Sequence, residues 1–163
     1  MFLREGDIRP PWNLLRQYVV AVIGPSVPWN AYYTQVYNLV RRFPAGTLFT
    51  SRNIRGVDHM TKLACEQLKQ DYREMIPPFD LPRWDDRAGR ARWFAVRNML
   101  IPIYANELHV FHGKMPDSWI GKIVRSARQR PTKLVEYGAD TQLSLFAPAE
   151  NAKLKRRQTH YSD

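Results

Sequence analysis

A chain of 163 residues is long enough for one domain with a buried core and too short for two ordinary domains. Hydrophobic residues make up 44% of it, which excludes wholesale disorder, and no apolar run is long enough to cross a bilayer. Residues 1–17 carry several charges and two adjacent prolines, unlike a signal peptide. We therefore expect a cytoplasmic protein with no membrane partner, in which the single cysteine, Cys65, is a buried small side chain.

The net charge of the chain is +10. Residues 1–17 and 139–163 each contribute +1, so +8 falls on residues 18–138. A strongly basic domain attracts phosphate groups, which makes DNA or a nucleotide the first partner to consider. The alternative is that the charge only keeps the protein soluble.

The first half of the domain alternates between apolar runs and helical spacing. A continuous apolar run over 18–23, closed by Gly24-Pro25-Ser26, predicts a strand buried on both faces. The spacing of apolar residues then predicts a helix over 32–43 and a second helix over 57–68. Shorter runs over 47–50 and 72–76 predict two further strands.

The second half repeats this alternation after a charge-rich stretch, residues 79–92, which reads as a loop. Helices are predicted over 91–100, with Pro102 near the end, and over 118–129. Strands are predicted over 107–111 and 132–137, and Gly138 ends the domain.

Strands that alternate with amphipathic helices favour right-handed βαβ units. The predicted fold class is therefore α/β, a single Rossmann-like three-layer domain with a mainly parallel five-stranded sheet. It spans residues 18–138, after an N-terminal extension over 1–17 and before a flexible C-terminal tail over 139–163, where the periodicity disappears.

Three predicted loops fall at the carboxyl ends of the strands, where open parallel sheets bind ligands. Ser26 could donate a hydroxyl to a phosphate, Arg55 could pair with the anion, and Gly56 would permit close backbone approach. Asp58 could contact a ribose or base, or could cap the helix that starts there. Gly113 and Lys114 follow the strand predicted over 107–111 and would lie at the same edge.

The motifs Gly24-Pro25-Ser26, Arg55-Gly56-Val57-Asp58 and Arg97-Asn98 recur in this order in the SLOG superfamily. The chain most closely resembles its YspA-like branch, and more distantly the DprA-like proteins, over residues 18–138. The resemblance implies a Rossmann-like domain that binds a nucleotide or nucleic acid at the strand ends. Carried over by position, it implies ligand contacts from seven residues: Gly24, Ser26, Arg55, Gly56, Asp58, Arg97 and Asn98.

The chain departs from that family where two glycines usually precede the Arg-Gly-Val-Asp motif. Arg52 and Asn53 stand there instead, and their side chains could fill the pocket or add a charge for a polynucleotide backbone. The glycine-rich loop and acidic residue of the phosphoribohydrolase members are also missing. Asp58 is thus only a weak catalytic candidate, and no catalytic residue is assigned. No cofactor or metal is expected, although a bound nucleotide or phosphate is compatible with the pattern.

The charge-rich stretch and the residues after it interleave cations with aromatic rings. Such a mixture suits neutralisation of a phosphate backbone combined with base stacking on single strands. The alternative is a solvated loop whose tryptophans cover the core. The candidate nucleic-acid contacts here are Arg83, Trp84, Arg87, Arg90 and Arg92.

The tail contains the pentapeptide Gln142-Leu143-Ser144-Leu145-Phe146. It resembles the motif by which bacterial polymerases and repair proteins bind the β sliding clamp. An extended peptide would place Leu145 and Phe146 in an apolar pocket, while Gln142 anchors it by hydrogen bonds. The alternative is that these apolar residues pack on the domain as a final strand. A basic segment follows and could contact DNA at the clamp; its cations are Lys153, Lys155, Arg156 and Arg157.

The sequence therefore predicts a DNA-associated binding protein that docks on the sliding clamp, such as a phage or mobile-element factor that modulates replication or repair. The alternatives are a nucleotide hydrolase or transferase of the same fold and a sensor of a nucleotide signal. The non-enzymatic function is the leading hypothesis.

Overall fold

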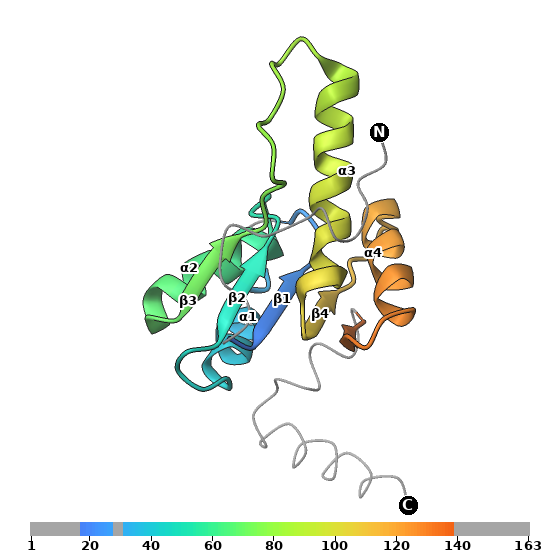
Figure 1. Ribbon diagram of the computed structural model, residues 1–163. Helices are drawn as coiled ribbons and strands as arrows, with labels where there is room; N and C mark the ends of the chain where they lie inside the picture. Colours follow the sequence, from blue (N-terminus) through green and yellow to red (C-terminus); the bar gives the residue numbers. More distant parts are fainter. Residues whose placement is uncertain (1–16, 28–30, 139–163) are drawn as a thin grey trace, which may run out of the picture.

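The computed structural model describes residues 17–27 and 31–138, and they form the predicted three-layer α/β domain (Figure 1). Five parallel strands make one sheet in the order β3-β2-β1-β4-β5. The strands are β1 (Val19–Ile23), β2 (Leu48–Ser51), β3 (Asp71–Glu74), β4 (Glu107–Phe111) and β5 (Lys133–Tyr137). The helices are α1 (Tyr33–Arg41), α2 (Val57–Leu68), α3 (Arg87–Tyr104) and α4 (Ser118–Arg128).

The central strand β1 is buried at all five positions, as its unbroken apolar run predicts. It pairs with β2 through Val20 and Phe49, and with β4 through Val22 and His109. Because side chains alternate between the faces of a strand, β1 feeds two separate cores. Val20 and Val22 pack under α1 and α2, whereas Ala21 and Ile23 pack under α3 and α4. The two helical layers therefore cover opposite faces of the sheet.

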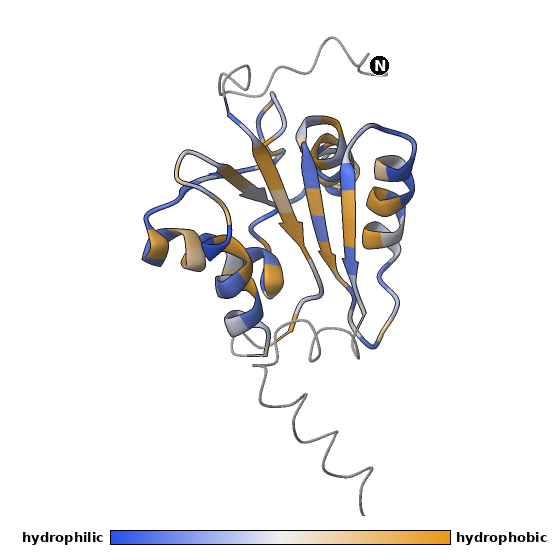
Figure 2. Cartoon of the chain, turned by 90° about the horizontal axis from the view of Figure 1, so that it is seen from below, coloured by the Kyte–Doolittle hydropathy of each residue, from blue (hydrophilic) through white to orange (hydrophobic). Residues whose placement is uncertain are grey.

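The helices turn their apolar residues toward the sheet and their charged residues outward (Figure 2). In α4, for example, Ile120, Ile123, Val124 and Ala127 are buried. The sequence pattern predicts this burial on a 3.6-residue period, and the buried side chains fix the orientation of each helix on the sheet. Cys65 is fully buried in α2, as expected, and burial raises the pKa of its thiol to about 12.

One predicted boundary is wrong by several residues. Residues 79–92 read as a loop, but α3 begins at Arg87, so Arg87, Arg90 and Arg92 are helical. Asp86 caps the helix, since its carboxylate accepts a hydrogen bond from the backbone N–H of Gly89 at 2.8 Å. The helix also continues through Pro102 to Tyr104.

The first half of α3 and the connection that precedes it stand clear of the sheet (Figure 1). We call residues 76–96 the arm. The connection runs beside the helix and is tied to it twice: the Trp93 indole N–H donates to the carbonyl of Phe79 at 3.0 Å, and Arg90 donates to the carbonyl of Pro82 at 3.1 Å. Because α3 runs antiparallel to the strands, the arm rises from the edge where the strands end.

No described helix is both long and apolar enough to cross a membrane. The candidate clamp-binding residues 142–146 and the basic segment 153–157 lie outside the described residues.

Candidate functional site

The loops after β1, β2 and β4 meet at the carboxyl edge of the sheet, around Pro25. A Cβ on Gly56 would lie 2.2 Å from the carbonyl oxygen of Pro25, and one on Gly113 would lie 3.0 Å from the Pro25 ring. Gly56 also has a φ of 100°, which favours glycine. The two glycines thus allow Pro25 to fit between the loops. The crevice between β1 and β4, where such sheets usually admit a ligand, is occupied there by the chain itself.

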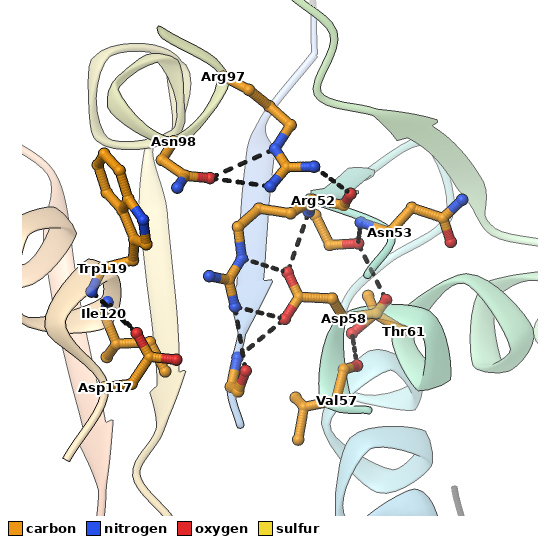
Figure 3. Close-up of polar contacts among 12 residues, drawn as sticks. Arg52, Asn53, Val57, Asp58, Thr61, Arg97, Asn98, Asp117, Trp119 and Ile120 are labelled. Atoms are coloured by element: carbon orange, nitrogen blue, oxygen red, sulfur yellow. Dashed lines mark hydrogen bonds and ion pairs between the residues drawn. The ribbon is translucent and has the colours of Figure 1, made fainter. Parts of the chain in front are cut away.

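Beneath these loops lies a buried ion pair between Arg52 and Asp58 (Figure 3). The guanidinium donates to both carboxylate oxygens at 2.8 Å, and it donates to the carbonyl of Gly24 at 3.0 Å. The carboxylate also accepts the backbone N–H groups of Gly24 and Arg52 at 3.1 and 3.0 Å. The pair therefore joins the end of β1 to the start of α2.

From the sequence, we expect Arg52 either to fill the pocket or to add a charge for a polynucleotide backbone. Its side chain turns inward, and the residue is only 3% exposed. It fills space at the strand ends and does not present its charge to a polynucleotide. Burial works to lower the pKa of Arg52, but the Asp58 carboxylate outweighs burial and raises it. The guanidinium is therefore held in its charged form.

Asp58 does not cap α2. The N-cap position is Gly56, and Asp58 is the second residue of the helix, with a carboxylate that is fully buried. The expectation that it caps the helix is wrong because the carboxylate is drawn to Arg52 and to the end of β1. A contact between Asp58 and a ligand stays a prediction, one that would require the ion pair to open.

Arg97 is a second buried arginine, 6% exposed, and it comes from the middle of α3 (Figure 3). It donates to the carbonyl of Arg52 at 3.4 Å and to the side-chain oxygen of Asn98 at 3.3 Å. Its guanidinium also lies 4.9 Å from the ring centre of Phe94 and 5.7 Å from that of Trp93. Burial lowers the pKa of Arg97, and the nearby charge of Arg52 lowers it further.

Four amide groups at the N-termini of α2 and α4 already have hydrogen-bond partners. At α2, the N–H of Val57 donates to the carbonyl of Pro25 at 3.3 Å. Two residues later, the N–H of His59 donates to the carbonyl of Ile54 at 3.1 Å. At α4, the Asp117 carboxylate accepts the N–H groups of Trp119 and Ile120 at 2.9 and 3.1 Å. These groups would have to exchange partners before they could hold a phosphate.

The site residues predicted from the sequence divide into buried and accessible sets. Gly24, Arg97 and Asn98 are buried with Asp58, and they belong to the interior of the edge. Ser26, Arg55 and Lys114 are exposed on three different loops. The exposed residues belong to the loops after β1, β2 and β4, and their contact with a ligand stays a prediction.

The exposed end of the arm carries the most accessible aromatic residue of the candidate site. Trp84 is 81% exposed, and its neighbour Arg83 is also exposed, with its guanidinium 3.6 Å from Asp85. Arg87 lies in the first turn of α3 and is exposed. Arg90 contacts the ring of Phe94 at 5.8 Å and holds the connection, so its role is at least partly structural. Trp93, by contrast, is 7% exposed and covers the core.

The two histidines of the β4 region point to opposite sides, as their spacing predicts. His109 is buried between Glu107 and Tyr137, with side-chain distances of 2.7 Å to each. His112 contacts Glu136 at 2.9 Å. Within residues 17–27 and 31–138, no three or more His, Cys, Asp or Glu side chains gather closely enough to suggest a metal site.

Sequence reasoning did not find the partner of Asp58. The signal available was an arginine six residues before an aspartate, a spacing that brings two side chains into contact in neither a helix nor a strand. The pairing arises only because the turn over 52–56 brings the two side chains together.

Comparison with protein-family models finds no match, and neither does comparison with curated proteins. Among solved structures, the chain is similar to the X-ray structure of DNA processing protein A (DprA) from Streptococcus pneumoniae. The identity is 14% and the TM-score is 0.46, and the match covers 80% of this chain and 62% of that one. The chain thus spans less than two thirds of the length of that structure.

Proposed function

We propose that this chain is a nucleic-acid-binding protein whose arm contacts the polymer. The observation that carries the proposal is Trp84, an indole that is 81% exposed at the far end of the arm. Leaving so large an aromatic ring in water is unfavourable, and a ring in this position can stack on an unpaired base. Arg83 and Arg87 lie beside it, close enough in the chain to neutralise flanking phosphates.

The state of the carboxyl edge supports a polymer over a mononucleotide. The usual crevice is filled by Pro25 and Arg52, and four amide groups at the starts of α2 and α4 are bonded within the protein. A ligand held on the outside of the molecule, by exposed cations and a ring, needs none of those groups. The nucleotide hydrolase, transferase and sensor alternatives would all need this edge to open.

Replacement of Trp84 by alanine tests the proposal. Base stacking on an aromatic side chain is worth about 1–3 kcal/mol, so W84A should weaken binding of a single-stranded oligonucleotide by roughly tenfold or more. W84F should retain part of the affinity, because phenylalanine can still stack. Fluorescence anisotropy measures both, and L81A is the matched control, since Leu81 is a 44% exposed apolar residue of the same arm. If W84A and L81A both bind the oligonucleotide with the affinity of the original protein, the arm is not the contact surface.

We further propose that the tail directs the protein to a bacterial β sliding clamp through Gln142-Leu143-Ser144-Leu145-Phe146. The support is the match at all five positions and the proline that follows in Ala147-Pro148, which disfavours a continued strand. Such a peptide concentrates its affinity in a few anchoring side chains. The arm and the tail together would place a nucleic-acid-binding domain at replicating or repaired DNA.

Binding to purified clamp, measured by surface plasmon resonance, tests this second part separately. Both Q142A and F146A should reduce the affinity by at least tenfold, since each removes an anchor. Ser144→Ala is the matched control, because its position accepts small residues. Retention of full affinity in Q142A and F146A would exclude the clamp motif while leaving the arm proposal intact.

A further inference from the structure

The outer side of α4 is a basic surface that the arm does not include. Helical geometry places six residues on this side, and all of them are exposed: Ser118, Gly121, Lys122, Arg125, Arg128 and Gln129. We call this set the α4 basic face. Within residues 113–137 there are six lysines and arginines and only two acidic residues, Asp117 and Glu136.

Both acidic residues are already engaged. Asp117 caps α4, and Glu136 contacts Arg128 at 2.9 Å and His112 at 2.9 Å. Neither Lys122 nor Arg125 contacts a carboxylate within the described part of the chain. Lys122 lies over the Trp119 ring at 4.4 Å, which orients its ammonium group on the outer side. Two cations thus face solvent without a counter-charge from residues 17–27 and 31–138.

Gly121 lies on the same side of α4, one residue before Lys122 and one turn before Arg125, and the fold does not account for it. At Gly24, Gly56, Gly89 and Gly113 an added Cβ would meet protein atoms within 3.0 Å. At Gly121 it would meet nothing within 4 Å, and the backbone there is ordinary helix. Glycine inside a helix destabilises it relative to alanine. A residue that costs stability where a side chain would fit freely indicates that something outside the chain approaches the backbone at that point.

From these two observations we infer that the α4 basic face binds the phosphate backbone of the nucleic acid, with Gly121 as the point of closest approach. The inference rests on the proposed function and extends it. Lys122 and Arg125 neutralise phosphates, while Ser118 and Gln129 offer polar groups at the two ends of the face. Because α4 packs beside α3, whose first half belongs to the arm, one nucleic-acid strand can reach both the arm and the α4 basic face.

An anionic membrane fits this face less well than a polynucleotide. Helices that lie on membranes insert an apolar side into the lipid. The apolar side of α4 is turned to the sheet, with Ile120 and Ile123 at most 3% exposed. The exposed side offers positive charges and, at Gly121, a position without a side chain, which suits a polyanion that remains in water.

Salt-dependent binding of the full chain to a single-stranded oligonucleotide tests the inference. Each phosphate contact contributes about 0.7 to the slope of log affinity against log salt, so K122Q/R125Q should lower that slope by about 1–2 and weaken binding about tenfold or more. The charge-matched control is K62Q/K69Q, since Lys62 lies in α2 and Lys69 is its C-cap, in the opposite helical layer. The control should leave slope and affinity within about twofold of the original protein.

Replacement of Gly121 separates binding from folding. Both G121A and G121Q should raise the melting temperature, because either residue favours helix over glycine, yet G121Q should weaken oligonucleotide binding severalfold by blocking close approach. A variant that is more stable but binds less well cannot be explained by misfolding.

Three outcomes would overturn the inference. If W84A abolishes binding while K122Q/R125Q and G121Q bind normally, the arm alone is the contact surface and the proposed function stands. If the original chain binds no oligonucleotide, the proposed function fails and the inference fails with it. If K122Q/R125Q loses binding only to vesicles that contain anionic lipids, the face is a membrane contact.

Discussion

The Asp58 carboxylate accepts four hydrogen bonds in a fully buried position, two of them from the Arg52 side chain. Burying two charges is costly, and their mutual attraction offsets that cost only while both are present. The ion pair therefore stabilises the carboxyl edge of the sheet only when both of its residues are intact. Any change that removes one charge leaves the other in a poorly hydrated interior, next to the further positive charge of Arg97.

The substitution Asp58→Asn tests this dependence, because asparagine removes the charge and keeps one oxygen, which can accept from one of the two backbone N–H groups. We expect the free energy of unfolding to fall by about 3–5 kcal/mol in chemical denaturation. The double variant R52M/D58N removes both charges and should recover part of the loss. Equal stability of the single and double variants would show that the hydrogen bonds, and not the charges, dominate.

At Gly121 the expected change has the opposite sign. Alanine in an exposed helical position is favoured over glycine by roughly 0.5–1 kcal/mol, and nothing in the structure obstructs a methyl group there. G121A should therefore raise the free energy of unfolding by about that amount, measured by denaturation of the full chain. A loss of stability in G121A would mean that the backbone at this position differs from ordinary helix.

Among the elements, α3 shows where a sequence pattern stops being informative. Its second half packs on the sheet, and the apolar spacing over 91–100 predicts it well. Its first turns belong to the arm and have little core to cover, so they carry charge without an apolar stripe. The sequence pattern there predicts a loop, although Asp86, a favoured N-cap residue, stands immediately before the first residue of the helix.

Loss of that cap should affect the arm more than the rest of the domain. D86A removes the acceptor for the Gly89 N–H and should cost about 1 kcal/mol, with faster amide hydrogen exchange in the first turns of α3. The neighbouring substitution D85A is the control, since Asp85 forms only an exposed contact with Arg83. Uniform acceleration of exchange across the sheet in D86A would contradict a local role.

Most of the remaining elements follow the sequence closely, because they bury a regular apolar pattern. The exception is β3, which has no buried residue and ends two residues earlier than predicted. The boundaries of β4 match the prediction, and those of α4 differ by one residue. The candidate site was less predictable for a physical reason. Arg52, Pro25 and Asp58 come together through turns whose geometry depends on contacts between distant segments, such as Gly56 against Pro25. A local spacing rule carries no information about such contacts.

At the scale of the whole molecule, a buried polar chain on β4 and β5 links folding to pH. A carboxylate only accepts hydrogen bonds, so His109 donates its Nε2–H to Glu107, and its Nδ1 accepts from the Tyr137 hydroxyl. Burial lowers the pKa of His109 below its ordinary value of 6.5. Burial works to raise the pKa of Glu107, but hydrogen bonds from His109 and Tyr18 outweigh it and lower that pKa below 4.5.

These shifts predict a loss of stability on acidification in two steps. As the pH falls through 6.5, the unfolded chain takes up a proton at position 109 more readily than the folded protein, so the free energy of unfolding decreases. Glu107 stabilises the fold above pH 4.5, and this contribution is lost as the pH falls through its lowered pKa. Urea unfolding at a series of pH values measures both steps.

Replacement of His109 should remove only the first step. H109Q keeps a polar side chain between Glu107 and Tyr137 but does not titrate, so the decrease that begins near pH 6.5 should disappear. The decrease below pH 4.5 should remain, although a weaker hydrogen bond to Glu107 makes it smaller. If H109Q still loses stability as the pH falls through 6.5, a titratable group other than His109 is responsible for that step.

The parallel sheet also determines how the domain would respond to mechanical load. Because all five strands point the same way, Gln17 lies at the edge where the strands begin and Gly138 at the edge where they end. A pull applied between these two residues would run along the strands and shear the hydrogen bonds from β1 through β4 to β5 together. In optical-tweezer experiments the domain should therefore resist force applied between 17 and 138 better than force that peels β5 from the edge of the sheet.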